Sequence, residues 1–153
     1  MRKNLFHLFV CISTTLVLSV TLSCREDKPF EPIVIDTQEE LIRLISSNAS
    51  SRYDGDLILT GNITSLEVLS DLEKIFGNLA IIDTQITTLD GLDNLILVTD
   101  DITITSTSPS FQNTTDFCAL QGLLAGGSFK SISIYNNQFN PTVQDIIEGN
   151  CSL

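Results

Sequence analysis

Three short segments decide the fold of this chain: DLIL at residues 56–59, NLAI at 78–81 and DITI at 101–104. Each begins with Asp or Asn and places two apolar residues two positions apart, which predicts a short strand with one apolar face. A fourth segment, ISI at 132–134, repeats the pattern after a longer insert. We therefore predict four parallel strands near residues 57–60, 79–82, 102–105 and 132–135. The side chains expected to face one core are Leu57, Leu59, Leu79, Ile81, Ile102, Ile104, Ile132 and Ile134.

A second apolar pattern lies between the strands and recurs one repeat further along the chain. Its two copies are Ile63, Leu66, Leu69, Leu72 and Ile75, and then Ile86, Leu89, Leu92, Leu95 and Val98. A period of about 20 to 29 residues with apolar positions in this order is typical of leucine-rich and related solenoids, in which each turn gives one strand to a parallel sheet. A single turn cannot bury its own apolar face, so the turns stack and the ends need covers. The sequence thus predicts an α/β solenoid of stacked parallel strands with capping helices.

The sequence also predicts the cover at the first end. Thr37 and Glu40 form a capping-box pattern, and the apolar residues that follow recur at helical spacing. These residues are Leu41, Ile42, Leu44 and Ile45. We expect a helix over about 37–47 and a loop from 48 to 55.

Two more helices are expected at the other end. Thr115 or Asp116 can cap a helix that Gly126 and Gly127 end by adopting left-handed backbone. Its apolar residues are Phe117, Ala119, Leu120, Leu123 and Leu124. The last helix is expected to have Asn140 as its cap, Pro141 at its first position and Gly149 just past its end, with Ile146 and Ile147 packed inward.

The N-terminus has the layout of an export signal. Arg2 and Lys3 precede an uncharged, largely apolar stretch that ends at Cys24. A permanent membrane span is the alternative, although several Ser and Thr residues dilute the apolarity of the stretch. TLSC at residues 21–24 resembles a bacterial lipoprotein signal, in which the cysteine becomes the lipidated first residue. Thr21 and Ser23 also suit ordinary signal cleavage.

Cysteine usage bears on the choice between these two kinds of cleavage. Cys11 leaves with the leader, so an odd number of cysteines remains in the exported chain. Lipidation of Cys24 explains the odd one. Cys118 and Cys151 are then left as a pair in an oxidising compartment, where a disulfide is the expected state. We divide the chain into a signal peptide at 1–23, a tether at 24–35 and one domain at 36–153.

Composition excludes several classes of function. The chain has 8 basic and 19 acidic residues and a formal net charge of −11, so nucleic acid is discounted as a partner. His7, the single histidine, leaves with the leader, and Cys118 and Cys151 alone make an incomplete zinc site. We therefore expect no metal and no cofactor.

Acidic pairs are the remaining route to catalysis, because two carboxylates suffice for glycoside hydrolysis. The candidates are Asp90 with Asp93, Asp100 with Asp101, and Asp145 with Glu148. Turn positions and a solvated helix face explain these residues more simply. We expect no enzymatic activity and name no catalytic residue.

Three phrases carry a family resemblance: GDLIL at 55–59, LDGLDNL at 89–95 and DFCAL at 116–120. From about Thr37 onwards the chain resembles the receptor L domain family and its relatives among exported bacterial leucine-rich proteins. The resemblance implies a right-handed parallel-sheet solenoid that binds extracellular ligands. We expect a lipid-anchored protein of the bacterial outer membrane or cell surface that binds an extracellular protein or glycan.

The alternative function is a structural component of the cell envelope with no specific soluble ligand. Part of the predicted sheet surface is hydroxylated, which favours a spacer over an adhesive surface. The residues concerned are Thr60, Thr103, Thr105, Ser131 and Ser133. An aromatic or aliphatic patch exposed on the sheet would favour binding.

Overall fold

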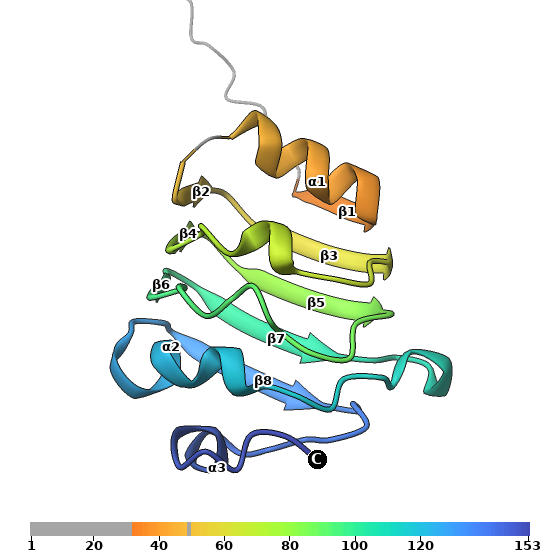
Figure 1. Cartoon of the computed structure of the whole chain (residues 1–153), viewed down its shortest axis with the longest axis vertical. Coiled ribbons are helices and arrows are strands. Elements are labelled where there is room, and N and C mark those ends of the chain that lie inside the picture. Colours follow the sequence, from red (N-terminus) through yellow and green to blue (C-terminus); the bar gives the residue numbers. More distant parts are fainter. Residues whose placement is uncertain (1–31, 49) are drawn as a thin grey trace, which may run out of the picture. The chain divides into compact units, whose positions relative to one another are not determined.

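The structure is a computed structural model that describes residues 32–48 and 50–153. The predicted signal peptide, the predicted lipidation site Cys24 and most of the predicted tether lie outside the described residues. The described chain is an α/β fold with two parallel sheets and few helices (Figure 1). None of the helices in this part of the chain is long and apolar enough to cross a membrane.

The larger sheet contains the four predicted strands and one more. Its order is β1 (Ile33–Thr37), β3 (Leu57–Asn62), β5 (Leu79–Thr84), β7 (Asp101–Thr105) and β8 (Ser131–Tyr135), and every neighbouring pair is parallel. The predicted strands and their direction are confirmed. The tether boundary needs correction, because Ile33, Val34 and Ile35 pair with β3 and belong to the sheet.

Strand register places the repeated apolar residues in two rows. Leu57 pairs with Leu79, Leu79 with Ile102, and Ile102 with Ile132. The second row follows two residues later, from Leu59 to Ile134. The row members on β3, β5 and β7 are buried as predicted, whereas those on β8 are half-buried. Since β8 is an edge strand, no further strand shields its apolar side chains.

The smaller sheet was not expected from the sequence. It consists of β2 (Arg52–Asp54), β4 (Lys74–Phe76) and β6 (Leu97–Val98), all parallel. β2 lies where we expected a loop. Its middle residue Tyr53 is buried and pairs with Ile75, which in turn pairs with Val98. Tyr53, Ile75 and Val98 belong to the same core cluster as the residues of the larger sheet, so this sheet adds a second side to that core. Figure 1 shows β2, β4 and β6 one below another.

The segments between the two sheets complete the core. All the residues of the second apolar pattern are buried, including Leu69 in the 3-10 helix η1 (Glu67–Leu69). Successive segments pack closely at Gly91, which has a φ of 104°. A Cβ at this position would lie 2.1 Å from the carbonyl oxygen of Leu66, so only glycine fits.

The first cover is the predicted helix, α1 (Gln38–Ser47). The Thr37 side chain accepts a hydrogen bond from the Glu40 amide at 3.3 Å, as expected for an N-cap. The capping-box pattern also predicts a bond from the Thr37 amide to the Glu40 side chain. That second bond is not present between these two described residues. Leu41 is fully buried, which attaches the helix to the end of the core.

The second cover differs from expectation in its boundaries. The segment after Asp116 begins as a 3-10 turn, η3 (Cys118–Leu120), before α2 (Gln121–Gly126), and the Asp116 carboxylate accepts from the Cys118 amide at 2.9 Å. Gly127, at the C-terminal end of α2, has a φ of −83°, so the expected left-handed ending is wrong. Leu123 and Leu124 are buried as predicted.

The last helix, α3 (Val143–Ile147), is capped by Thr142 and not by Asn140. Thr142 and Asp145 exchange both bonds of a capping box. The Asn140 side chain instead accepts from the Asn137 amide and donates to its carbonyl oxygen, so its polar groups are used in a turn. Gly149 follows the helix with a φ of 85°, and Ile146 is buried; both agree with prediction.

Candidate binding face

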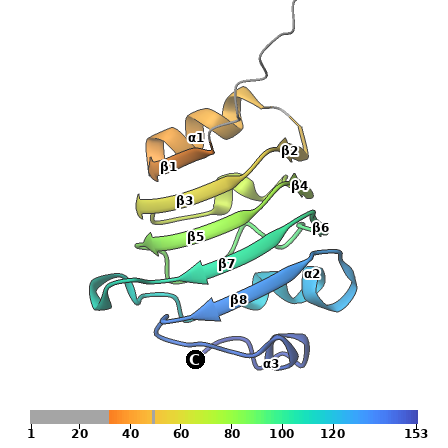
Figure 2. The ribbon, with the colours of Figure 1, turned by 180° about the vertical axis from the view of Figure 1, so that it is seen from behind.

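The larger sheet has one face toward the core and one face away from it. In Figure 2 the five strands are seen from behind, and no described helix lies across them. We call this surface the open face. It is formed by the alternate residues that point away from the core: Val34, Ile58, Thr60, Ala80, Ile82, Thr103, Ser131, Ser133 and Tyr135.

Apart from Thr60 on β3, strand register divides the open face into an apolar half on β1, β3 and β5 and a hydroxylated half on β7 and β8. Val34 pairs with Ile58, and Ile58 with Ala80, so β1, β3 and β5 present a continuous apolar row. Val34 is 53% exposed. Ile82 on β5 extends this half toward the strand ends. Both faces of a parallel sheet are normally covered by other elements. Apolar residues on a face that is left uncovered therefore mark a surface for interaction.

The hydroxylated half lies on β7 and β8. Thr103 pairs with Ser133, and Thr105 pairs with Tyr135. Tyr135 is 48% exposed, while Thr105 is buried. The Thr105 hydroxyl has no hydrogen-bond partner among the described residues. The expectation of a part-polar sheet surface therefore holds for this half, but the apolar half contradicts a uniformly polar spacer surface.

A ladder of side chains crosses the starts of the strands. Asp56 accepts from the Asn78 amide and side chain at 2.8 and 2.9 Å, and the Asn78 side chain accepts from the Asp101 amide at 3.1 Å. Asp101 then accepts from the Ser131 hydroxyl at 2.8 Å. The Asp and Asn that open each repeat thus link one strand to the next. The bond from Ser131, aided by Lys130, lowers the pKa of Asp101 below its ordinary value of 3.8.

Another carboxylate organises the ends of the strands. Asp83 has a positive φ of 54° and accepts from the Thr107 amide at 2.6 Å and from the Ser106 hydroxyl at 3.2 Å. Hydrogen bonds from Thr107 and Ser106 lower the pKa of Asp83, against a smaller opposing effect of burial. Asp83 is therefore a carboxylate anion at neutral pH, and its role in the fold is to hold the loop after β7.

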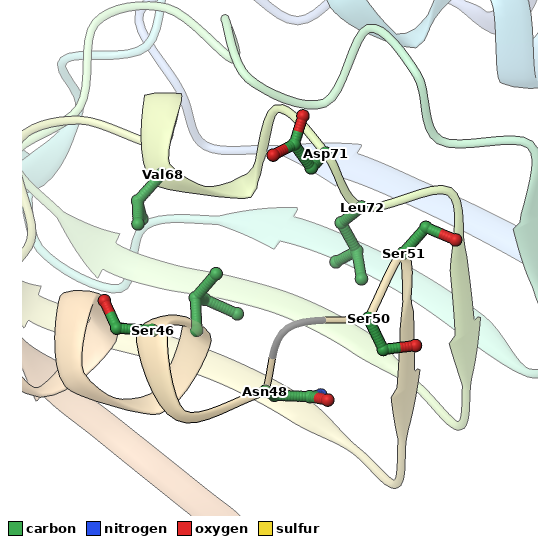
Figure 3. Close-up of a pocket in the computed structure, with 8 residues that line it drawn as sticks. Ser46, Asn48, Ser50, Ser51, Val68, Asp71 and Leu72 are labelled. Carbon is green, nitrogen blue, oxygen red and sulfur yellow. The ribbon is translucent and has the colours of Figure 1, made fainter.

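Hollows elsewhere on the described chain do not collect reactive groups. Figure 3 shows a hollow of about 390 Å³ between α1, the segment before β2 and η1. Asp71 is the single carboxylate in its lining, and its other polar side chains are hydroxyls and one amide. Two smaller hollows lie beside β1 and beside β8, with volumes of about 310 and 240 Å³. Within residues 32–48 and 50–153, no three His, Cys, Asp or Glu side chains gather as a metal site.

At least one carboxylate of each acidic pair weighed from the sequence has a structural partner. The Asp93 side chain accepts from the Gly91 amide at 3.0 Å, which stabilises the turn before it. Asp145 belongs to the capping box of α3, and Glu148 accepts from the Gln144 side chain at 2.6 Å. These contacts agree with the interpretation of the pairs as turn and helix-surface residues.

The predicted disulfide is present. Cys118 in η3 and Cys151 after α3 are joined, with Cα atoms 4.9 Å apart. Backbone bonds reinforce the connection, because the Phe117 amide donates to the Cys151 carbonyl at 2.9 Å and the Leu153 amide to that of Thr115 at 3.1 Å. The pair therefore fastens the C-terminal segment to the second cover.

Sequence reasoning did not identify the apolar half of the open face. The available signal was that Ile58, Ala80 and Ile82 are apolar at the alternate positions where a half-exposed strand should be polar. Val34 gave no such signal because we had assigned it to the tether.

In comparisons with protein-family models, curated proteins and solved structures, nothing matches this chain.

Proposed function

We propose that this protein is a non-enzymatic binding module, exported and lipid-anchored through Cys24, whose receptor-L-like solenoid contacts an extracellular protein through the open face. The observation that carries the proposal is the uncovered apolar row Val34, Ile58 and Ala80 across three strands. Burying such a row against a partner contributes about 25 cal/mol per Å² of apolar surface removed from water.

The regular offset between strands supports the solenoid. Leu57, Leu79 and Ile102 succeed one another in the larger sheet, while Tyr53, Ile75 and Val98 do so in the smaller one. Three successive repeats thus give one strand to each sheet, as β2 with β3, β4 with β5 and β6 with β7. Helices stand at both ends of the series, as a stack of repeats requires for its terminal units (Figure 1).

The chemistry of the open face favours a protein over a glycan. Its apolar half is aliphatic, and Tyr135 is the one aromatic residue among the members of the open face. Aliphatic surface has few groups with which to orient the hydroxyls of a sugar, whereas it packs well against apolar side chains of a protein. The hydroxylated half can supply hydrogen bonds at the rim of such an interface.

Photo-cross-linking on intact cells tests the proposal. A photoreactive amino acid replaces Ile58 in the open face, and the same replacement at Ile96 serves as the control. Ile96 is 50% exposed and lies next to β6 in the smaller sheet. We expect a defined protein adduct from position 58 and none of that size from position 96. The same adduct from both positions, or none from position 58, would contradict binding by the open face.

A further inference from the structure

Carboxylates border the open face at both ends of its strands. Asp56 and Asp101 stand at the starts of β3 and β7, Asp83 lies at the end of β5, and Asp36 is exposed on β1. The hydrogen-bond partners of Asp56 and Asp83 are neutral side chains and amides, whereas Asp101 also contacts Lys130. Neutral donors leave the negative charge of a carboxylate in place. Within the described residues, Asp36, Asp56 and Asp83 therefore border the apolar half without an ion-pair partner.

Among the residues that the structure describes, the cations near the open face do not balance these anions. Lys130 lies beside the start of β8, with its ammonium nitrogen 3.4 Å from an oxygen of Asp101. Arg43 lines the hollow next to β1, but Glu40 lines the same hollow. Lys130 is thus paired with Asp101, and Arg43 shares its hollow with the carboxylate of Glu40. The electrostatic potential at the open face is therefore negative, and so is the formal net charge of the whole chain, which is −11.

We propose that the partner of the open face is a cationic polypeptide segment, which packs apolar side chains on Val34, Ile58 and Ala80 and directs Lys or Arg side chains to the bordering carboxylates. This inference rests on the proposed binding function and specifies the chemistry of the partner. Arg and Lys form charge-assisted hydrogen bonds with carboxylates, and the opposite charges accelerate encounter. Anionic polymers are repelled by the same border.

A second copy of the chain is a poor occupant for the same reason. Pairing two open faces would bring Asp36, Asp56 and Asp83 of each copy toward like charges of the other. Like-charge contacts oppose association, and at physiological salt they act over about 8 Å. The border of carboxylates therefore selects a basic partner and disfavours self-association through this surface.

Titration of the purified domain with two synthetic peptides tests the inference. One peptide alternates lysine and leucine, the other alternates glutamate and leucine, and both carry a fluorescent label for anisotropy measurements. We expect the lysine peptide to bind and the glutamate peptide not to bind. Raising the salt concentration should weaken the binding, because ions screen exposed charges.

Matched variants locate the site. Ile58→Arg and Val34→Arg place a cation on the open face, while Ile96→Arg makes the same charge change on the smaller sheet. We expect the first two to weaken binding of the lysine peptide by about tenfold or more and Ile96→Arg to have little effect. Val34 is the more exposed of the two positions, so its variant keeps the test valid if Ile58→Arg unfolds the domain.

The outcomes separate the two proposals. Equal weakening by all three variants would show non-specific attraction and overturn the inference. Equal binding of both peptides, lost in Val34→Arg, would overturn the cationic partner but leave the open face as a binding surface. If neither peptide binds, the cationic partner is wrong, and cross-linking at position 58 then decides the proposed function by itself.

Discussion

At the scale of single residues, repeated side chains do two different tasks. The Leu and Ile residues that face inward make the core, while Asp56, Asn78 and Asp101 connect the strands through their hydrogen bonds. Buried polar groups are normally satisfied, and these half-buried ones are satisfied as well. The Thr105 hydroxyl departs from that rule, since it is buried without a partner among the described residues.

We predict that Thr105→Val stabilises the domain. A buried hydroxyl without a hydrogen bond costs about 1 to 3 kcal/mol, and valine has nearly the same shape, so we expect the free energy of unfolding to rise by about 1 kcal/mol. The measurement is the urea midpoint at constant slope. The control is Thr103→Val on the same strand, where the side chain reaches solvent. Destabilisation by Thr105→Val would mean that the hydroxyl has a partner, such as a bound water.

At the scale of elements, each end of the repeat series is closed by different means. α1 covers the first end through its buried Leu41 and its Thr37 cap. The second end is covered by α2 and α3, and α3 has five residues, too few to be stable alone. The disulfide and the bonds around Cys151 supply the attachment that the short helix lacks.

We predict that reduction of the disulfide loosens the second cover before the rest of the domain. The bond closes a sequence separation of 33 residues, and a loop of this size is worth about 3 to 4 kcal/mol in the chain-entropy model. Hydrogen exchange should accelerate in α3 and at residues 150–153 and remain slow in β3 and β5. A Cys118→Ala, Cys151→Ala double variant is the control, because reductant should not change its exchange. Uniform acceleration across the domain would contradict a local role.

At the scale of the whole molecule, the proposed arrangement joins a membrane anchor to a binding face. Export and anchoring rest on the sequence around Cys24, whereas binding rests on the open face of the sheet. These two parts can be tested separately. A failure of the anchor would leave the binding face intact, since β1 begins nine positions after Cys24 at Ile33.

We predict that Cys24→Ser releases the protein from membranes or blocks its processing. Each lipid methylene buried in a bilayer contributes about 0.8 kcal/mol, so loss of the acyl chains removes the proposed attachment. Cell fractionation measures the result, and mass spectrometry of the mature N-terminus identifies the modification. Cys11→Ser, in the predicted leader, is the matched control and should leave localisation unchanged. Wild-type protein that is soluble with an unmodified Cys24 would contradict the anchor.

The sequence by itself determined four of the five strands of the larger sheet and the closing disulfide. Alternation fixes which residues of a strand share a face, and the repeat fixes which strands are neighbours, so the repeat pattern alone aligns Leu57, Leu79 and Ile102. The cap at Thr37 and the pairing of Cys118 with Cys151 were also predictable, because each depends on local chemistry or on elimination.

Tertiary structure alone decided the smaller sheet and the open face. Strands of two or three residues, such as β6 (Leu97–Val98), carry no period of their own and exist because neighbouring repeats supply their hydrogen bonds. Ile58 and Ala80 are apolar like the core residues beside them, and only the placement of the covering segments shows that their side of the sheet is left uncovered. Burial depends on what packs against a face, and that is a property of the assembled chain.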